Sequence, residues 1–428
     1  MSTALKMDAT SRAVESAPTG HAGAKVLPAV AFVWEQFGVY HLDRLEALAN
    51  AFQGKRRVVG IEFASRSLTY AWAPTKGAAG GWERHTLFPD GVAESIPWWR
   101  KATALRRILS MSGVQDVFLC NQERPEILAV LPLLRAQGYR CYAMLDAKFD
   151  DSPRRVSKEF AKRAVFRLYN GGLLAGPPDG AEAASNRSRH LDYYRFLGMH
   201  ARWARPGYDV VSIARVREHA GGDAALPPEG GASHADRPFV CVARFVPKKD
   251  LATAVRALAL LRRNAAPGSL AARRRLVLCG AGPLKNELRA LVQSEGIADA
   301  VSFPGFLDAE AVARTLGSAL ALVLPSVEEQ WGLVVNEAVA LGVPVLCSDN
   351  VGARDSLVRT GVNGFSFEPG NHEGLSLLMR LVSEDEVLWR GLSRSCARFA
   401  PLGDVAAFVA GVDALLPIAP AHDKGRLK

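Results

Sequence analysis

Residues 325–338, with the sequence PSVEEQWGLVVNEA, decide the fold that we expect for this chain. They follow the apolar run 319–324, which is typical of a buried strand, and they lead into a helical pattern of apolar residues. Glu329 should therefore lie in the loop after a strand, and Glu337 in the first turns of the next helix. In an open α/β sheet this loop lies at the carboxyl end of the strands, where ligands bind. The adjoining helix N-terminus favours an anion such as phosphate.

The rest of the chain alternates between strand-like and helix-like stretches, which indicates parallel sheets covered by helices on both faces. In the first half we expect strands at 29–34, 58–63, 117–120 and 140–145, and helices at 41–52 and 125–137. In the second half we expect strands at 239–242, 276–278, 300–303, 319–324 and 343–347, and final helices at 373–399 and 404–416.

Residues 218–237 are rich in Gly, Pro and Ala, a composition typical of a linker. We therefore expect a Rossmann-like domain over residues 26–217 and a second Rossmann-like domain over residues 238–416. Residues 1–25 are expected to form a disordered leader and residues 417–428 a tail. The fold class is α/β, with two doubly wound domains, and a chain of 428 residues is long enough for both.

The composition is that of a soluble globular protein, with 49% hydrophobic and 22% charged residues. The sequence contains no apolar run of about 18 residues, which a transmembrane helix would require. The N-terminus lacks the pattern of a signal peptide. The six cysteines contain no CxxC pair, and most lie in strand-like runs, so we expect buried, reduced thiols and no zinc site. These features predict a cytoplasmic location.

The two acids of residues 325–338 have a characteristic spacing and context. Glu329 and Glu337 are separated by seven residues, and Trp331-Gly332-Leu333 lies between them. This pattern resembles the donor-sugar motif of retaining glycosyltransferases of family 4, the bacterial polysaccharide-type group 1 enzymes. Further matching segments occur in order at 242–250, 278–284, 301–307 and 350–365. The resemblance implies the GT-B plan, in which two Rossmann-like domains face each other across a cleft.

The resemblance also implies roles for individual residues. Arg244 and Lys249 would hold the diphosphate of a nucleotide sugar, where Arg offers a planar fork and Lys a compact point charge. Glu329 would contact the donor sugar and complete the catalytic set, and Glu337 would accept hydrogen bonds from the ribose. The full set of expected donor-binding residues is Gly38, Gly282, Phe303, Gly305, Trp331, Gly332, Leu333, Val334 and Glu337. For Gly282, Phe303 and Gly305 a purely structural turn or strand end remains an alternative.

The acceptor side is less recognisable in the sequence. His41 lies at the start of a helix and faces either the cleft or solvent. Many members of the family carry a His after a later strand, but Asp146 stands roughly in that place here. We therefore take His41 and Asp146 as the candidate acceptor-side residues.

The basic charge is uneven along the chain. The formal net charge is +10, and residues 1–235 hold 31 basic and 23 acidic side chains. Residues 153–169 form a basic amphipathic helix, which is either an ordinary surface helix or a contact with an anionic membrane. The sequence Trp98-Trp99-Arg100-Lys101 adds to the membrane interpretation. No nucleic-acid-binding motif accompanies the charge.

Together these observations predict a retaining hexosyltransferase that moves a sugar from a UDP- or GDP-linked donor to a saccharide or lipid-linked acceptor. The resemblance implies polysaccharide or glycolipid synthesis in bacteria, on the inner face of the membrane. It also implies no cofactor and no divalent metal, and no Asp-x-Asp motif is present. The alternatives are a GT-B nucleotide-sugar epimerase and a catalytically silent GT-B scaffold.

Overall fold

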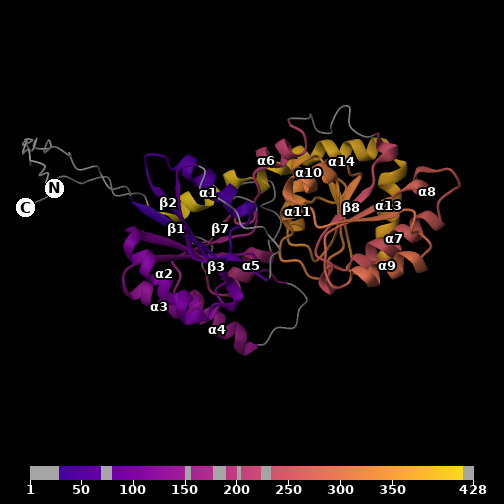
Figure 1. Cartoon of the computed structure of the whole chain (residues 1–428). Helices are drawn as coiled ribbons and strands as arrows, with labels where there is room; N and C mark the ends of the chain where they lie inside the picture. Colours follow the sequence, from indigo (N-terminus) through magenta and orange to yellow (C-terminus); the bar gives the residue numbers. More distant parts are fainter. Residues whose placement is uncertain are drawn as a thin grey trace, which may run out of the picture.

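The computed structural model describes residues 28–68, 80–149, 156–176, 189–199, 204–222 and 233–417. The predicted leader, residues 223–232 of the predicted linker and almost all of the predicted tail lie outside the described residues. Two α/β domains lie side by side, the first in indigo and magenta and the second in orange (Figure 1). This is the expected fold class, with a parallel sheet at the centre of each domain.

The first domain contains a parallel sheet with the order β3-β2-β1-β4-β5-β6-β7. Its strands are β1 Ala29–Trp34, β2 Arg57–Arg66, β3 Trp82–Val92, β4 Val114–Leu119, β5 Arg140–Leu145, β6 Gly171–Leu174 and β7 Ala204–Pro206. Its helices are α1 Val39–Ala51, α2 Trp98–Ser112, α3 Pro125–Ala136, α4 Val156–Phe166 and α5 Arg189–Phe196. Helix α6 Ile213–His219 follows this domain in the chain and packs against the second domain. The strand order reverses between β1 and β4, which creates a crevice at their carboxyl ends.

The second domain repeats this plan with the sheet order β10-β9-β8-β11-β12-β13. Its strands are β8 Phe239–Val242, β9 Leu276–Cys279, β10 Val301–Gly305, β11 Ala321–Leu324, β12 Val345–Ser348 and β13 Gly364–Phe367. Its helices are α7 Leu251–Arg263, α8 Leu270–Arg273, α9 Lys285–Ser294, α10 Ala309–Gly317, α11 Leu333–Ala340, α12 Arg354–Leu357, α13 His372–Glu384 and α14 Glu386–Phe399. Here the order reverses between β8 and β11.

Hydrophobic pattern explains why these strands form at these places. Strand β11 is buried along its whole length, as a central strand of a parallel sheet must be. Strands β1, β5 and β8 have the predicted bounds. The six cysteines are all buried and free of disulfides, as expected.

One sequence prediction about the final helices is wrong. The expected single helix over 373–399 is two helices, α13 and α14, which meet at Asp385. The Asp385 carboxylate accepts a hydrogen bond from the backbone N–H of Leu388 at 2.8 Å. This N-cap starts a new helix in a new direction, a signal that the apolar periodicity alone does not show.

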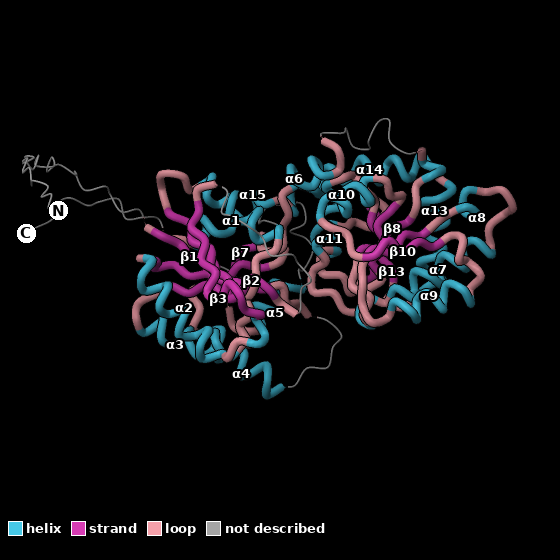
Figure 2. Tube along the Cα trace, in the orientation of Figure 1, coloured by secondary structure: helices cyan, strands magenta, loops and turns pink. Residues whose placement is uncertain are grey.

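The last helix, α15 Val405–Leu415, returns to the first domain and packs beside α1 (Figure 2). The approach to β7 is very close, because a Cβ added at Gly207 would lie 2.3 Å from the Ala407 carbonyl oxygen. The chain therefore crosses between the domains twice. The two crossings lie side by side, with Val211 N–H donating to Gly403 O at 3.0 Å and Val405 N–H donating to Val211 O at 3.1 Å.

Helices α2, α3 and α4 lie on one side of the first sheet (Figures 1 and 2). Of the predicted basic helix over 153–169, the structure describes α4 from Val156, and residues 153–155 lie outside the described part. Lys101 is buried on α2, where its ammonium contacts Glu126 at 2.9 Å. It therefore does not face outward with Trp98 and Trp99, which are 50% and 57% exposed. In the described part of the chain, no helix has the length and apolar content needed to cross a membrane.

Candidate functional site

A cavity of about 540 Å³ lies between the two domains, at the carboxyl ends of both sheets. We call it the interdomain cavity. From the second domain it is lined by Val242, Lys249, Phe306, Leu307, Asp308, Ala309, Val312, Leu324, Glu329, Trp331, Gly332, Leu333, Val334 and Glu337. From the first domain it is lined by Gly38, Val39, Tyr40, Asp146 and Asp209. Most of the residues predicted for the site therefore lie around one space.

Lys249 and Glu329 form an ion pair at this cavity. The two residues come from different loops, and backbone hydrogen bonds from Val327 and Glu328 to the carbonyl of Lys248 hold those loops together. The Ser326 hydroxyl lies 3.4 Å from the Glu329 carboxylate. Both charged side chains remain partly exposed to the cavity, at 12% and 15%. The pair can therefore meet a ligand that carries both a negative group and hydroxyls.

The start of α11 faces the same cavity. Gly332 immediately precedes this helix with φ +99°, a left-handed conformation that favours glycine. Gly332, Leu333 and Val334 thus bring the amino end of a helix to the cavity, where an anion is stabilised.

The Trp331 ring lines the cavity and also supports the fold through a buried hydrogen bond. It is 3% exposed, and its Nε1–H donates to Asn336 Oδ1 at 2.8 Å. The Asn336 amide in turn donates to the carbonyls of Asp209 and Gly403, both at 3.1 Å. One side chain therefore connects the Trp331 indole to both chain crossings between the domains.

Glu337 lies buried in α11 and contacts the first domain. The Tyr40 hydroxyl donates to Glu337 Oε1 at 3.0 Å, so this hydrogen bond joins the two domains. Burial raises the pKa of Glu337 to about 7, although the Tyr40 hydrogen bond and Arg215 oppose the effect. Arg215 itself is held by Asp43 at 2.8 Å.

A second cavity of about 480 Å³ adjoins the first, and we call it the first-domain cavity. Loops that follow β1, β4, β5 and β7 supply most of its lining: Trp34, Glu35, Gln36, Cys120, Asn121, Gln122, Glu123, Arg124, Met144, Leu145, Asp146, Ala147, Tyr208 and Asp209. Tyr40, Asp146, Asp209 and Leu333 line both cavities. A ligand in one cavity can therefore reach a ligand in the other.

The two candidate acceptor-side residues both line the first-domain cavity. His41 faces neither bulk solvent nor the interdomain cavity: its Nδ1 accepts from the Gly38 N–H at 2.9 Å, and its ring packs against Trp34. Burial lowers the pKa of His41 well below its usual value, so the imidazole is neutral at pH 7. Burial, and then the neighbouring Glu329 and Glu123, raise the pKa of Asp146.

Besides His41, four predicted residues lie away from the lining of the interdomain cavity. Arg244 is exposed in the loop after β8, and Gly282, Phe303 and Gly305 lie nearby in the second domain. The structure gives Gly282 a packing reason, because a Cβ there would lie 2.5 Å from the Phe245 carbonyl oxygen. Phe303 packs edge-on against Phe245. The structural alternative thus accounts for Gly282 and Phe303 in this conformation.

The lining residues that sequence reasoning missed include Tyr40, Asp209 and Phe306. Tyr40 lies between two residues that were singled out, and only its contact with Glu337 across the domains marks it. Asp209 follows the short strand β7, which was not predicted. Burial raises the pKa of Asp209 to about 8, and the negative charge of Asp146 adds to the effect. Phe306, which is 60% exposed, directly follows Gly305.

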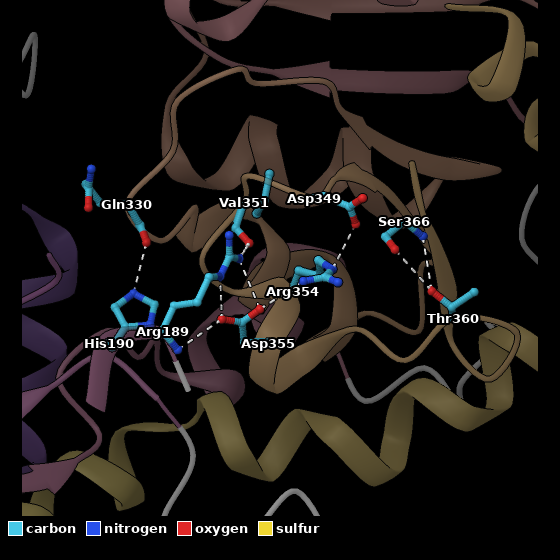
Figure 3. Close-up of polar contacts among 9 residues, drawn as sticks. All are labelled: Arg189, His190, Gln330, Asp349, Val351, Arg354, Asp355, Thr360 and Ser366. Carbon is cyan, nitrogen blue, oxygen red and sulfur yellow. Dashed lines mark hydrogen bonds and ion pairs between the residues drawn. The ribbon is translucent and has the colours of Figure 1, made fainter. Parts of the chain in front are cut away.

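A further interdomain contact supports the loop that carries Glu329 (Figure 3). Arg189 of α5 makes a two-pronged ion pair with Asp355, at 2.8 and 3.0 Å, and donates to the Val351 carbonyl at 3.0 Å. His190 is fully buried and lies 3.0 Å from the Gln330 carbonyl through Nε2, which must carry the proton because a carbonyl only accepts. Burial lowers the pKa of His190 to about 4, so the imidazole is neutral at pH 7 and its single N–H lies on Nε2.

Among the residues that the structure describes, no cluster of three or more His, Cys, Asp or Glu side chains is arranged to hold a metal ion.

Residues 225–401 match the profile of the family described as "Glycosyl transferases group 1". This segment is therefore similar to the group 1 glycosyl transferases. It is 34% identical over 144 residues to a glycogen synthase of Mycobacterium tuberculosis, which covers 34% of this chain and 33% of that protein. The chain spans about a quarter to a third of the length of the curated relatives that it matches.

Solved structures show the fold over about nine tenths of the chain. Sucrose-phosphate synthase from Thermosynechococcus elongatus superposes with a TM-score of 0.66 at 18% identity, over 91% of this chain and 98% of that one. Anabaena Alr3699/HepE in complex with UDP-glucose gives a TM-score of 0.61 at 16% identity, over 91% and 100%. The segment that matches the group 1 profile is thus the second half of a GT-B fold, and the first domain completes it.

Proposed function

We propose that this protein is a retaining hexosyltransferase that uses a nucleotide-diphosphate sugar, linked to UDP or GDP. The observation that carries the proposal is the grouping of Lys249, Glu329, Glu337 and the start of α11 around one cavity between two Rossmann-like domains. The group 1 family match and the likeness to a UDP-glucose complex support it. Polysaccharide or glycolipid synthesis in bacteria is the proposed setting.

The proposed roles follow from charge and position. Lys249, together with the start of α11, would face the donor diphosphate, and Glu329 would face the sugar. Glu337 would accept hydrogen bonds from the ribose. For this, the Tyr40 hydroxyl must release the Glu337 carboxylate or share it with the ribose. Arg244 would reach the diphosphate from the edge of the cleft. Its exposure in the present conformation makes it the residue whose role most needs a test.

In the proposed reaction the bond between the anomeric carbon and the donor phosphate oxygen breaks. The acceptor oxygen bonds to the same face of that carbon, and its proton passes to the leaving phosphate. Positive charge that develops at the anomeric carbon would be stabilised by Glu329, and negative charge on the leaving group by Lys249 and Arg244. We propose that no divalent metal and no other cofactor takes part.

A thermal-shift series with UDP, GDP and ADP and their common sugars, without metal, tests the donor site. A nucleotide that binds only the folded protein raises its melting temperature. We expect one nucleotide to do so, and Arg244→Ala to remove the shift. Arg394→Ala, a matched exposed arginine on α14, should leave it intact. If Arg244→Ala kept both the shift and full turnover, the proposed role of Arg244 would be wrong.

Product analysis separates the alternatives. A retaining transferase with an α-linked donor releases nucleoside diphosphate and gives an α-linked product, which NMR of the anomeric proton identifies. An epimerase would change the configuration at another sugar carbon without an acceptor. A catalytically silent scaffold would bind the nucleotide sugar and release no nucleoside diphosphate from it. An inverted product would refute retention while leaving transfer in place.

We also propose that the side of the first domain formed by α2 and α4 contacts an anionic membrane, where a lipid-linked acceptor is presented. Val156 and Phe160 of α4 are 71% and 65% exposed, on a helix whose single acid, Glu159, is buried. The exposed Trp98 and Trp99 begin α2, a helix that has no acidic residue. Exposed apolar side chains beside basic ones are typical of helices that lie in a membrane interface.

Vesicle co-sedimentation tests this surface. We expect binding to vesicles that contain phosphatidylglycerol and little binding to pure phosphatidylcholine. Trp99→Ser and Phe160→Ser should weaken it, and Leu377→Ser should not, because Leu377 is similarly exposed but lies on α13 of the second domain. Equal binding to both kinds of vesicle, or no effect of the first two substitutions, would contradict the proposal.

A further inference from the structure

In the lining of the first-domain cavity, Asp209 and Gln122 each carry a buried acceptor oxygen that has no hydrogen-bond donor among the described residues. Glu35 Oε1 also lacks a hydrogen bond, but it lies 3.6 Å from the Lys101 ammonium. Asp209 Oδ2 and Gln122 Oε1 are both buried without a hydrogen bond, in side chains that are 8% and 4% exposed as whole residues. A buried polar atom without a partner costs about 1–3 kcal/mol. Such atoms in the lining of a cavity therefore indicate that a ligand supplies the missing donors.

The orientation of Gln122 is fixed by its other contacts. Its Nε2 donates to the carbonyls of Leu119 at 3.0 Å and Met144 at 2.8 Å. A flipped amide would place its oxygen against two carbonyl oxygens, so the amide cannot turn to offer an N–H to the ligand. Gln122 thus presents an acceptor to the cavity.

Each cation of this cavity already faces an acid. Arg44 is 2% exposed, lies 3.6 Å from the Asp209 carboxylate and stacks on the Tyr208 ring, while its Nε–H makes no hydrogen bond. Arg124 contacts Glu35 at 3.0 Å. Among the lining residues that the structure describes, no other Arg or Lys is present to receive a phosphate. The neighbouring acids Asp146 and Glu123 would repel one.

The cavity also has an apolar side. Trp34 and Tyr208 both line it, and the Trp34 indole N–H donates to the Tyr208 hydroxyl at 3.2 Å. Flat aromatic surfaces beside hydrogen-bonding groups suit a sugar ring, which has apolar C–H faces and polar hydroxyl edges. Asp209 lines the interdomain cavity as well, so it lies where the acceptor and the donor would meet.

We propose that the first-domain cavity binds an uncharged, hydroxyl-rich saccharide as the acceptor, whose hydroxyls donate to Asp209 Oδ2 and Gln122 Oε1. This inference rests on the proposed transferase function and narrows its acceptor class. A hydroxyl both donates and accepts, so it fits Asp209 whether that group is ionised or protonated. The phosphate of a phosphorylated sugar would instead meet acids, and cations that already face an acid.

Two nearly isosteric substitutions test the proposal. In Asp209→Asn the amide oxygen should turn to Arg44, because a guanidinium requires an acceptor, and an N–H₂ donor then replaces Oδ2. Gln122→Met removes Oε1 and keeps the length of the side chain. Glu373→Gln is the control, since Glu373 is an exposed acid on α13 that lines neither cavity.

The measurement is saturation-transfer NMR on the full chain with saturating UDP. The probes are methyl α-glucoside, methyl α-mannoside, methyl β-galactoside and maltotriose, against glucose 6-phosphate and mannose 6-phosphate. We expect at least one neutral probe to bind, and the phosphorylated probes to bind about tenfold or more weakly. Loss of a hydrogen bond to a buried acceptor should weaken the neutral probe about tenfold or more in both variants, and Glu373→Gln should change nothing.

Three results would overturn the inference: tighter binding of the phosphorylated probes, no binding of any neutral probe, or unchanged binding in both folded variants. Melting curves of each variant show whether it is folded, and Gln122→Met leaves the Arg44 pair intact if Asp209→Asn unfolds. A UDP-induced melting shift without saccharide binding would refute this inference and leave the donor proposal standing. Saccharide binding without any nucleotide response would refute the transferase proposal.

Discussion

Glu337→Gln should make the protein more stable at alkaline pH while it weakens nucleotide binding. Glu337 is 4% exposed, and burial raises its pKa to about 7 from a usual value of 4.5. Between these two pH values the folded state holds a proton that the unfolded state has released. The free energy of unfolding therefore falls as pH rises through this window, and the loss is complete above it.

The size of the effect follows from the pKa difference. Each unit of pKa corresponds to about 1.4 kcal/mol, so the buried charge costs about 3 kcal/mol at pH 8. Glutamine keeps the shape and an acceptor for the Tyr40 hydroxyl, but it carries no charge to bury. The variant should match the wild type near pH 4 and exceed it at pH 8. For a domain of this size that corresponds to roughly 6–12 °C in melting temperature.

The assay is a melting curve of the wild type and of Glu337→Gln at pH 4.5, 6 and 8. The melting temperature of the transition of the second domain is compared between the two proteins at each pH. Asp209, whose pKa is also raised by burial, is present in both proteins, so its contribution cancels in the difference. The control Glu373→Gln, at an exposed acid, should melt at the wild-type temperature at every pH. If the difference in melting temperature between Glu337→Gln and the wild type does not grow with pH, or if Glu337→Gln is less stable at pH 8, the charge of Glu337 is not the cause. The same variant should bind UDP about tenfold more weakly, because the ribose loses a charged acceptor.

Four further outcomes are expected. Trp331→Phe should cost about 1–3 kcal/mol of stability, seen as a lower melting temperature, because Asn336 loses the donor to its buried oxygen; an unchanged melting temperature would contradict this. Gly352→Ala should destabilise by about 1–3 kcal/mol or more, since its Cβ would lie 1.8 Å from the Gln330 carbonyl oxygen. Gly391→Ala, on an exposed face of α14 with open space around it, should instead stabilise by about 0.5–1 kcal/mol in the same melting assay. Incubation with EDTA should leave nucleotide release unchanged, and a loss that Mg²⁺ restores would refute metal independence.

Periodicity predicted the regular parts of this fold well. The expected strands at 29–34, 140–145 and 239–242 are present with those bounds, because each is a short buried run with clear ends. Strand β3 was not predicted, since it is a long strand at the edge of the sheet with many partly exposed polar residues. Its sequence contains Pro89 and lacks a buried face that repeats every second residue.

The candidate site was predictable where it is local in sequence. Glu329 and Glu337 lie in the loop and helix that residues 325–338 predicted. The contacts that join the two halves of the molecule were not, because they depend on how the domains face each other. Tyr40 meets Glu337 across 297 positions of sequence, and Arg189 meets Asp355 across 166. Asp209 has no local motif, and only its burial between two cavities marks it.

The amide of Asn336 has a consequence for how this molecule could move. The two chain crossings are joined by an isolated parallel β-bridge between Val211 and Asp404, so opening of the cleft would bend two hydrogen-bonded segments rather than a single flexible linker. The Asn336 amide donates to the carbonyls of Asp209 and Gly403 on the two crossings, and its oxygen accepts from Trp331, which lines the interdomain cavity. A displacement of the Trp331 loop on nucleotide binding would therefore be transmitted to the pivot directly, through two hydrogen-bonded side chains. Under the proposed function, the angle between the domains would therefore differ with and without the bound nucleotide.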